Sequence, residues 1–515
     1  MRKPADAASR TRPPVKRPAP APARSPLQTA RGNDVEVVHV VAEYGFYART
    51  GGLAEAVQSL SRYQAVTGIR TTVIMPLYRS VRKQGHVLEP VGEPFGVELG
   101  GRHDGVQLYR LAGHQDGPQL IFVDNRDCFD REGLYGEGGA DYADNARRFA
   151  LFCLAALDAL PRLTRGPVVL HAHDWHAALS ILYLRTTFAG DARYDRVSAV
   201  LSVHNAGYQG HFPPSVLPEI GVSPALYNFQ VLEWYGRVNL LKGGLAFADA
   251  VTTVSPTHAR ELRTPDGGFG LHDVFRGLGD RLIGIANGID HTAWDPATDL
   301  HTVAHYSAAD LSGKVRCKAY MQQSLGFPQA PRTPLFVMSA RLVSQKGIEL
   351  ILRSDLLSAS DAQFAFLGQG EPRFVQALRE IAARAPGRVN VNTDFTDAGE
   401  HVLIAGGDLL LMPCVYEPCG LTQMRAQRYG VVPVARRTGG LADTIDDGVT
   451  GFLFDDYEPP ALLGAIARAM HHYANPTAWA SLMREGMARD FSWERSEQKY
   501  LQVYRRVLAA SPLRA

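Results

Sequence analysis

Short apolar runs followed by amphipathic stretches recur along the chain from residue 35 onward. Val35–Ala42 is largely apolar and β-branched, which is typical of a strand buried on both faces of a sheet. A turn at Gly51 and Gly52 follows, and apolar residues then recur at helical spacing over Leu53–Leu60. The pattern therefore predicts the strand, turn and helix of a parallel β-sheet.

The same alternation fills two separate parts of the chain. In the first part we expect strands at Thr71–Met75, Gln119–Val123, Val168–His171 and Ala199–His204, and helices at Asn145–Leu160 and His176–Thr187. In the second part we expect strands at Pro334–Ser339, Ala362–Leu367, Val389–Val391 and Leu409–Met412, and helices at Gly347–Leu357 and Glu371–Ala385. Two such series predict an α/β fold with two doubly wound, Rossmann-like domains.

The boundary between the two domains is expected within residues 276–290. A helix-like segment around Val274 precedes it, and a strand-like segment at Leu282–Ile285 lies inside it. We therefore place the first domain at residues 34–282 and the second at residues 283–490. Ligands of doubly wound sheets bind beyond the carboxyl ends of the strands, which predicts a site in a central cleft that both domains face.

Residues 1–33 are rich in Pro, Ala and Arg and hold almost no large apolar side chains. Such a segment cannot bury enough surface to offset its ordering entropy, so a disordered tail is predicted. Its excess of basic over acidic residues would also suit a transit peptide to a plastid. Few serines and many prolines favour the plain tail of a cytoplasmic protein.

Composition and charge narrow the class of protein. The 54 basic and 52 acidic residues give a net charge of +2, which gives no argument for a nucleic-acid or membrane partner. No stretch approaches the ~20 consecutive apolar residues of a membrane span. The five cysteines lack metal-ligand spacing and are odd in number, which argues against a complete disulfide framework and favours a reducing compartment.

The loop Arg49–Leu53 follows the first expected strand. Gly51 and Gly52 allow close approach of the backbone to an anion, and the helix that follows supplies free N–H groups. Arg49 could add a charge-assisted contact to a phosphate. An ordinary turn between a strand and a helix explains the same residues equally well.

Three histidines and an aspartate lie close together after the apolar run that begins at Val168. His171 and His173 share one face of a strand, and Asp174 and His176 begin a helix. Asp174 therefore suits the N-cap position of that helix. A sugar contact is a second interpretation, and a metal site is a third and weaker one.

His204 and Asn205 follow the strand expected at Ala199–His204 and would project into the cleft. Both side chains suit the recognition of sugar hydroxyl groups. A histidine that is satisfied by the backbone is an equal alternative. No serine or cysteine nucleophile pattern accompanies this pair, so a catalytic triad is not expected.

Arg341 and Lys346 lie where the first strand of the second series passes into a helix. Cations at a helix N-terminus oppose the helix dipole, so they make sense there if they face an anion such as a diphosphate. An exposed pair without a function is the alternative interpretation.

The segment Glu417–Gln423 follows the last strand expected in the second series. Gly420 permits close approach of the backbone, Leu421 and Thr422 offer N–H donors at a helix start, and Glu417 could accept sugar hydroxyls. A plain turn with a solvated glutamate is the alternative. The chain has neither a Gly-x-x-x-x-Gly-Lys-[Ser/Thr] loop nor an Asp-x-Asp metal pair, so fixed cations would neutralise a diphosphate.

Taken together, these motifs resemble those of bacterial glycogen synthases and plant starch synthases. In that family's order they are Arg49–Leu53, His171–His176, His204–Gly210, Lys242–Leu245, Ala248–Thr257, Asn287–Asp290, Pro296–Asp299, Arg341–Gly347 and Glu417–Gln423. They span about residues 35–500. The resemblance implies a GT-B fold, ADP-glucose as the donor, a growing α-1,4-glucan or glycogen as the acceptor, retention of configuration, and neither cofactor nor metal.

The resemblance also implies roles for individual residues. The first domain would bind the acceptor, the second would bind the donor, and residues 491–515 would hold a helix that crosses back to the first domain. The implied catalytic residues are Glu417, Arg341, Lys346, His204 and Asp174. The implied donor-binding residues are Arg49, Gly51, Gly52, Asn205, Asn287, Phe395, Cys419, Gly420, Leu421 and Thr422.

Several positions depart from the family's pattern. Arg49 stands where the family usually has Lys, Glu55 where it has Asp, and Phe395 where it has Tyr. Arginine keeps the charge of lysine but is bulkier and forked. The family's Ser-Arg-Phe reads Cys414-Val-Tyr416 here, and the segment between Asp443 and Gly451 is shorter than usual.

Two other functions remain open at this point. One is a related GT-B transferase that uses UDP-glucose or makes a small saccharide such as maltose 1-phosphate. The other is a weakened homologue that binds glucan or regulates its synthesis, which the departure at Arg49 motivates. The presence of Arg341, Lys346 and Glu417 argues against the weakened homologue.

Overall fold

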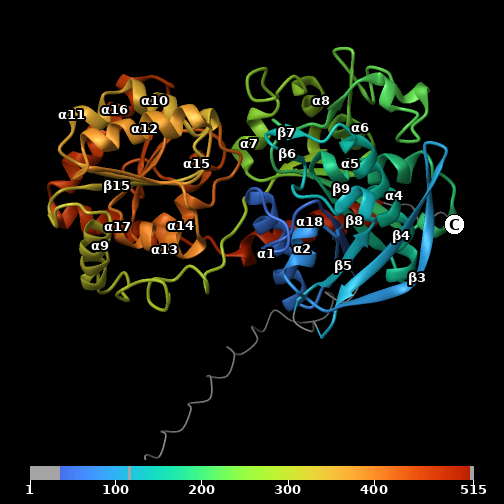
Figure 1. The fold of residues 1–515 in the computed structure, drawn as a ribbon, viewed down its shortest axis with the longest axis horizontal. Helices are drawn as coiled ribbons and strands as arrows, with labels where there is room; N and C mark the ends of the chain where they lie inside the picture. Colours follow the sequence, from blue (N-terminus) through green and yellow to red (C-terminus); the bar gives the residue numbers. More distant parts are fainter. Residues whose placement is uncertain (1–34, 114–116, 511–515) are drawn as a thin grey trace, which may run out of the picture.

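The computed structural model describes residues 35–113 and 117–510. They form two α/β lobes that lie side by side (Figure 1). Each lobe is a doubly wound sheet with helices on both faces, which confirms the predicted fold class. The tail predicted for residues 1–33 lies outside the described residues.

The first lobe is built on a sheet of nine strands in the order β14-β13-β9-β8-β1-β2-β5-β4-β3. The strands are β1 (Glu36–Val40), β2 (Arg70–Pro76), β3 (Leu88–Leu99), β4 (Arg102–Leu111), β5 (Gln119–Asp124), β8 (Val168–His173), β9 (Val197–Val203), β13 (Ala250–Thr253) and β14 (Leu282–Gly284). The helices are α1 (Gly52–Val66), α2 (Arg79–Lys83), α3 (Arg126–Phe129), α4 (Asn145–Leu163), α5 (Asp174–Arg185), α6 (Leu240–Phe247), α7 (Pro256–Glu261) and α8 (His272–Gly277). All strands from β14 to β5 in this order pair in parallel.

The edge of this sheet differs from the prediction of parallel strands alone. β3 and β4 form a long antiparallel hairpin, and β4 joins it to β5. Gly100 and Gly101 make its turn at φ values of 60° and 73°, in the left-handed region that tight hairpin turns require. In the sequence, the Gly-Gly pair was the signal for the turn of this hairpin. The flanking strands mix exposed charges with few apolar residues and show no clear two-residue period, so the strands themselves were not predicted.

Short strands form two further small sheets in the first lobe. β6 (Gly136–Glu137) pairs with β7 (Ala140–Asp141). β10 (His211–Phe212), β12 (Arg237–Asn239) and β11 (Glu233–Trp234) form a three-stranded antiparallel ribbon. This ribbon begins a few residues after β9 and extends the rim of the lobe.

The second lobe has a parallel sheet of six strands in the order β17-β16-β15-β18-β19-β20. The strands are β15 (Leu335–Ser339), β16 (Gln363–Leu367), β17 (Val389–Asn392), β18 (Leu409–Met412), β19 (Val432–Arg436) and β20 (Phe452–Phe454). The helices of this part of the chain are α9 (Ser312–Ser324), α10 (Ile348–Arg353), α11 (Leu356–Ala359), α12 (Pro372–Arg384), α13 (Asp397–Gly406), α14 (Thr422–Arg428), α15 (Gly439–Thr444), α16 (Pro459–Tyr473), α17 (Pro476–Met487) and α18 (Trp493–Ala510).

One helix of the second lobe is shorter than predicted. The sequence favoured a single helix over Gly347–Leu357, whereas α10 ends at Arg353 and α11 begins at Leu356. Asp355 between them has a φ of 52°, a left-handed conformation that cannot continue a right-handed helix. The prediction of one continuous helix is therefore wrong.

The predicted boundary at residue 282 cuts through the first sheet. β14 begins at Leu282 and pairs in parallel with β13, so it is the edge strand of the first lobe. Ile285, just after it, packs with residues of the first sheet. The strand-like pattern at this place was correct, but it closes the first lobe instead of opening the second.

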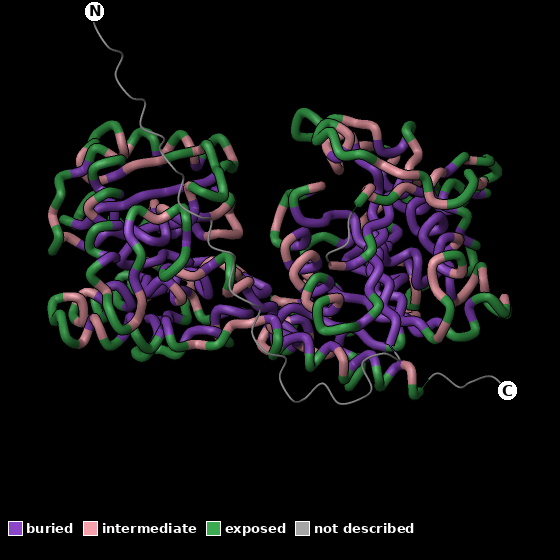
Figure 2. The backbone as a smooth tube through the Cα atoms, turned by 90° about the horizontal axis from the view of Figure 1, so that it is seen from below, coloured by how far each residue is buried: buried purple, intermediate pink, exposed green. Residues whose placement is uncertain are grey.

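Both sheets are buried on both faces, as the apolar runs predicted. In β15, Leu335 and Val337 pack into one cluster, while Phe336 and Met338 pack into another on the opposite face. This alternation follows from the two-residue period of a strand. Figure 2 shows the buried backbone concentrated in the middle of each lobe, with exposed segments outside.

The last helix, α18, leaves the second lobe and packs on the first (Figure 1). Its apolar residues recur at helical spacing and face the sheet of the first lobe. The cluster that they form joins residues from both ends of the chain: Val35, Val37, Leu60, Ile69, Val169, Val200, Ala250, Ile285, Trp493, Tyr500, Val503, Tyr504 and Val507. The helix thus completes a core that begins more than 400 residues earlier in the sequence.

All five cysteines are buried and unpaired. Within the described residues, every helix is too short or too polar to cross a membrane.

We expect Tyr500→Ala to destabilise the protein because Tyr500 is buried between α18 and the first sheet. Truncation of a buried aromatic side chain leaves a cavity and costs about 3–5 kcal/mol. Equilibrium unfolding in urea, followed by circular dichroism, measures the loss. The neighbouring exposed Lys499 supplies a matched control. Unfolding of Tyr500→Ala and Lys499→Ala at the same urea concentration would contradict the packing of α18.

Candidate active site

A cavity of about 1490 Å³ lies between the two lobes, at the carboxyl ends of the parallel strands. Loops that follow β1, β8 and β9 line it from the first lobe, and loops that follow β15, β16, β17 and β18 line it from the second. Every residue that the sequence placed in the site lines this cavity: Arg49, Gly51, Gly52, Asp174, His204, Asn205, Asn287, Arg341, Lys346, Phe395, Glu417, Cys419, Gly420, Leu421 and Thr422.

Glu43 orders the glycine loop, and the sequence analysis did not identify it. Its carboxylate accepts the backbone N–H groups of Thr50 at 2.6 Å and Gly51 at 3.3 Å, and the hydroxyl of Tyr135 at 2.7 Å. The N–H of Gly51 is therefore already occupied by a protein carboxylate. The signal in the sequence was the position of Glu43, a single acidic residue just after the apolar run of β1. Functional groups often lie at the carboxyl ends of parallel strands.

Arg49 connects the two lobes across the cavity. Its guanidinium lies 3.2 Å from Asp397 of the second lobe and 3.8 Å from Glu55 of its own lobe. Glu55 also pairs with Arg425, whose other partner is Glu400 at 3.1 Å. Burial alone would raise the pKa of Glu55, but the guanidinium of Arg425 outweighs burial and lowers that pKa. Two positions that depart from the family pattern thus belong to one chain of ion pairs.

Asp174 does not cap helix α5. The helix begins at Asp174 itself, and no side chain bonds to its first N–H groups. Instead, Asp174 Oδ1 accepts the backbone N–H of His204 at 2.7 Å, and Asp174 has a left-handed φ of 57°. The N-cap interpretation is therefore wrong, because a tertiary partner takes the carboxylate. Its effect is to fasten the loop after β9 to the end of β8.

The environment of Asp174 changes its acidity. Burial raises the pKa of Asp174 from 3.8 to about 7, while hydrogen bonds from the backbone of His204 and Asn205 act in the opposite direction. A carboxyl group with this pKa can carry a proton near neutral pH. At pH 7 Asp174 is therefore only partly ionised.

Three histidines, His39, His173 and His204, form a line of hydrogen bonds that ends at the cavity. His39 Nδ1 lies 2.9 Å from His173 Nε2, and His173 Nδ1 lies 3.0 Å from His204 Nε2. His171 lies beside them, with its ring tilted by 34° and its ring centre 4.2 Å from that of His173. Burial lowers the pKa of His39 to about 4 and that of His204 to about 3, so these rings are neutral at pH 7.

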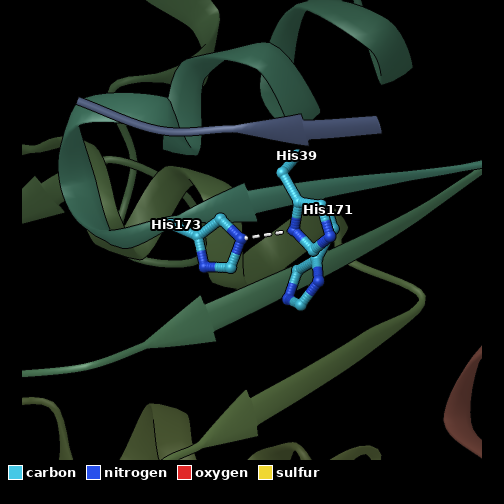
Figure 3. Close-up of side chains that lie close together, drawn as sticks. All are labelled: His39, His171 and His173. Carbon is cyan, nitrogen blue, oxygen red and sulfur yellow. Dashed lines mark hydrogen bonds between the residues drawn. The ribbon is translucent and has the colours of Figure 1, made fainter. Parts of the chain in front are cut away.

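His39, His171 and His173 lie close enough to consider a metal ion (Figure 3). All six of their ring nitrogens already have hydrogen-bond partners. These partners include Gln64, Tyr504, Ser202 and His204 in addition to the contact between His39 and His173. A metal would have to displace several of these bonds inside the core. The arrangement therefore fits a hydrogen-bonded network better than a metal site.

The second lobe supplies a paired cation and carboxylate at the centre of the cavity. Lys346 Nζ lies 2.5 Å from Glu417 Oε2, and Cys414 donates to the same oxygen at 3.5 Å. Burial would lower the pKa of Lys346, but the carboxylate of Glu417 outweighs it and raises that pKa. Arg341 is exposed at the same wall of the cavity. The wall thus has one neutralised pair and one additional positive charge.

Gly347 fixes the position of Lys346. Its φ of 76° lies in the left-handed region, and a Cβ there would lie 1.9 Å from the carbonyl oxygen of Pro413. The backbone therefore turns tightly against the loop after β18, directly after Lys346. Glycine alone allows both the left-handed φ and the close approach to Pro413.

The Gly-Gly turn at Gly439 and Gly440 supports the loop that carries Glu417. Gly440 N–H donates to the carbonyl oxygen of Glu417 at 3.0 Å. A Cβ at Gly439 would lie 1.9 Å from that same oxygen. The sequence alone gave this turn no role, because Glu417 lies 22 residues before Gly439 and is brought near only by the fold.

The remaining predicted residues lie around this centre. Asn205 accepts the N–H of Gly207 at 2.9 Å, so its side chain shapes the loop after β9. Phe395, in the loop after β17, is 38% exposed and lines the cavity. Asn287 is buried and contacts Cys419 through its backbone. The cavity therefore combines an aromatic face, fixed cations and neutral polar groups.

This combination suits one chemical class of ligand. The open ring of Phe395 can stack on a base, Arg341 and Lys346 can neutralise phosphates, and the neutral groups on the first lobe can bind hydroxyls. A molecule with all three parts is a nucleotide sugar. Two such walls on separate lobes leave space for a second substrate between them.

Two family models match the chain. The starch synthase catalytic domain matches residues 36–277, and the group 1 glycosyl transferases match residues 324–484. The two matches correspond to the first and second lobes. Together they cover most of the chain.

Curated proteins resemble the chain along nearly its whole length. A glycogen synthase from Anaeromyxobacter sp. (strain Fw109-5) is 41% identical over 482 residues, which are 92% of this chain and 100% of that protein. A glycogen synthase from Syntrophotalea carbinolica is 40% identical over 483 residues, which are 92% and 99% of the two chains. These similarities confirm the resemblance seen in the motifs.

Solved structures give the same result. The catalytic domain of starch synthase IV from Arabidopsis thaliana, bound to ADP and acarbose, matches with a TM-score of 0.84 and 32% identity, over 92% of this chain and 100% of that chain. Sucrose-phosphate synthase from Thermosynechococcus elongatus matches with a TM-score of 0.59 and 17% identity, over 92% and 99% of the two chains. The second likeness concerns the fold alone, and the fold is GT-B.

We expect Gly347→Ala to displace Lys346 because the added Cβ would overlap the carbonyl of Pro413. Left-handed strain in a residue other than glycine costs about 1–3 kcal/mol, and the overlap adds to it. Gly464 in α16 is a matched control, since a Cβ there meets nothing within 4 Å. Thermal unfolding and turnover of both variants provide the measurement. Equal behaviour of the two variants would show that the turn at Gly347 is dispensable.

Proposed function

We propose that this chain, which belongs to the glycogen and starch synthase family, transfers glucose from ADP-glucose to the non-reducing end of an α-1,4-glucan with retention of configuration. Family membership makes it a glycosyltransferase. The donor, the acceptor and the roles of individual residues are the parts that we propose. The first lobe would bind the glucan and the second the nucleotide sugar.

The observation that carries this proposal is the wall formed by Arg341, Lys346 and Glu417. During transfer, negative charge grows on the leaving diphosphate and positive charge grows at the anomeric carbon. Arg341 and Lys346 stabilise the first, because preorganised charges in a cleft need no rearrangement at the moment of reaction. Glu417 lies next to Lys346 and can bind the sugar hydroxyls.

The diphosphate and the acceptor share one face of the sugar in this proposal. A retaining transfer without an enzyme nucleophile requires the acceptor to arrive on the face from which the diphosphate leaves. Asp174 and the loop of His204 and Asn205 close the opposite side from the first lobe. Because His204 is neutral at pH 7 and Asp174 is only partly ionised there, these groups bind hydroxyls with little competition for Arg341 and Lys346.

Donor choice and independence of metal can be tested in one assay. We expect label from ADP-glucose to enter glycogen with a much higher kcat/KM than label from UDP-glucose, and we expect EDTA to leave most of the activity. Phe395 offers its face to a purine, and fixed cations take the place of a divalent ion. Preference for UDP-glucose would overturn the donor assignment. Activity that is lost to EDTA and restored by one metal would overturn the metal-free mechanism.

Single substitutions at the wall test the assigned roles. We expect Arg341→Ala and Lys346→Ala to lower kcat by roughly 10²–10³-fold, or about 2.7–4 kcal/mol, by analogy with loss of one oxyanion donor. Glu417→Ala should lower kcat at least as much, because it removes the sugar contact and leaves Lys346 unpaired. The effect falls on kcat because these charges act more strongly in the transition state than in the ground state.

The exposed ion pair of Arg353 and Glu458 on the outside of the second lobe supplies matched controls. Arg353→Ala and Glu458→Ala remove the same kinds of charge away from the cavity and should keep normal turnover. Circular dichroism of each purified variant checks the fold. Near-normal kcat for any variant of Arg341, Lys346 or Glu417 would remove that residue from the catalytic set.

A further inference from the structure

The line of buried histidines continues past His39 to the last helix of the chain. His39 Nε2 lies 2.8 Å from Oε1 of Gln64 in α1. The amide nitrogen of Gln64 donates to the hydroxyl of Tyr504 in α18 at 3.1 Å. An unbroken path of hydrogen bonds therefore runs from α18 through Gln64, His39 and His173 to His204 at the cavity.

The direction of this path follows from the amide of Gln64. Since its oxygen can only accept, His39 must carry its proton on Nε2 and can only accept at Nδ1. His173 then donates from Nε2 to His39, and accepts at Nδ1 from Nε2 of His204. Because a neutral imidazole carries one proton, each ring fixes the tautomer of the next.

The remaining nitrogen of His204 is the one that meets substrate. His204 lines the cavity, and its Nε2 is used by His173. Within the described residues, Nδ1 of His204 has no hydrogen-bond partner and is not among the enclosed polar atoms. This nitrogen carries the lone pair if Nε2 carries the proton.

We propose that Gln64, held by Tyr504, sets the tautomer of His204, so that Nδ1 accepts a hydrogen bond from a hydroxyl of the sugar in the cavity. Gln64, His39 and His173 are positioning residues, because they touch no substrate and act through His204. This inference rests on the proposed function, in which the sugar of the donor lies against the loop after β9. It assigns a role to His39 and Gln64, which none of the sequence motifs included.

Burial supports a single arrangement along the line. Gln64, His39 and His173 are fully buried, so a donor without an acceptor costs about 1–3 kcal/mol. Desolvation holds the pKa of His173 well below its ordinary value, and the neighbouring histidines lower it further. The rings therefore stay neutral, and only the placement of the single proton on each ring remains to be set.

Removal of the Gln64 amide should reverse the direction of the hydrogen bonds along the histidine line. In Gln64→Met the shape is retained, but Nε2–H of His39 loses its acceptor. The free-energy cost of this unpaired N–H is avoided if the proton of His39 moves to Nδ1. His39 then donates to His173, and His173 donates to His204. His204 would then carry its proton on Nδ1, and the lone pair at the cavity would be lost. In Gln64→Glu a carboxylate oxygen still accepts from His39, so the original direction should remain.

Nuclear magnetic resonance of the histidine ring nitrogens measures this directly, because the ¹⁵N shift separates a protonated nitrogen from an unprotonated one. We expect Nδ1 of His204 to be unprotonated at pH 7 in the unmodified protein and in Gln64→Glu, and protonated in Gln64→Met. The spectrum of His204→Gln identifies the signals of His204. A protonated Nδ1 in the unmodified protein, or the same tautomer in Gln64→Met, would overturn the proposal.

Turnover tests whether the tautomer matters for the transfer. We expect Gln64→Met to lower kcat about tenfold, the worth of roughly one hydrogen bond, with little change in KM for glucan. Gln64→Glu should recover most of the loss. A reversed tautomer with unchanged kcat would also contradict the proposal. If the unmodified protein transfers no glucose at all, the proposed function fails, while the spectra still decide the direction of the histidine line.

Discussion

The direction of the strands is the constraint on which the rest of this structure depends. Parallel strands carry their functional loops at one edge, and the two sheets of this chain turn those edges toward each other. Glu43, Asp174, His204, Arg341 and Glu417 come from loops after different strands, yet all line one cavity.

Ion pairs between residues near these same edges also connect the two lobes. Arg425 of the second lobe is buried between Glu55 of the first and Glu400 of its own, and Arg49 reaches Asp397 from the first lobe. Loss of one carboxylate partner would leave the buried guanidinium of Arg425 uncompensated, which destabilises the folded state. Arg425 therefore favours the positions that Glu55 and Glu400 occupy. The departures at positions 49 and 55 both keep the charge of the residue that they replace and lie within one network of opposite charges.

The sequence predicted those parts of the molecule that depend on local pattern. Strands buried on both faces are apolar throughout, so Leu409–Met412 was located to the residue as β18. The cavity residues were recognised because the motifs lie at strand ends. The role of Asp174 and the partners of Gln64 could not be predicted, since both depend on residues that only the fold brings near. Asp355 broke a helix that its neighbours favoured, because a single left-handed residue overrides helical spacing.

The position of α18 has a consequence for synthesis on the ribosome. Val35 and Val37 are made before the second lobe, yet the cluster that covers them needs Tyr500 and Tyr504, which are made after it. One apolar face of the first sheet therefore stays uncovered while the second lobe is being made. The two lobes therefore cannot fold one after the other during synthesis: the first lobe becomes complete only after the second has been made, and a product that lacks α18 would keep an exposed apolar face that chaperones and proteases recognise.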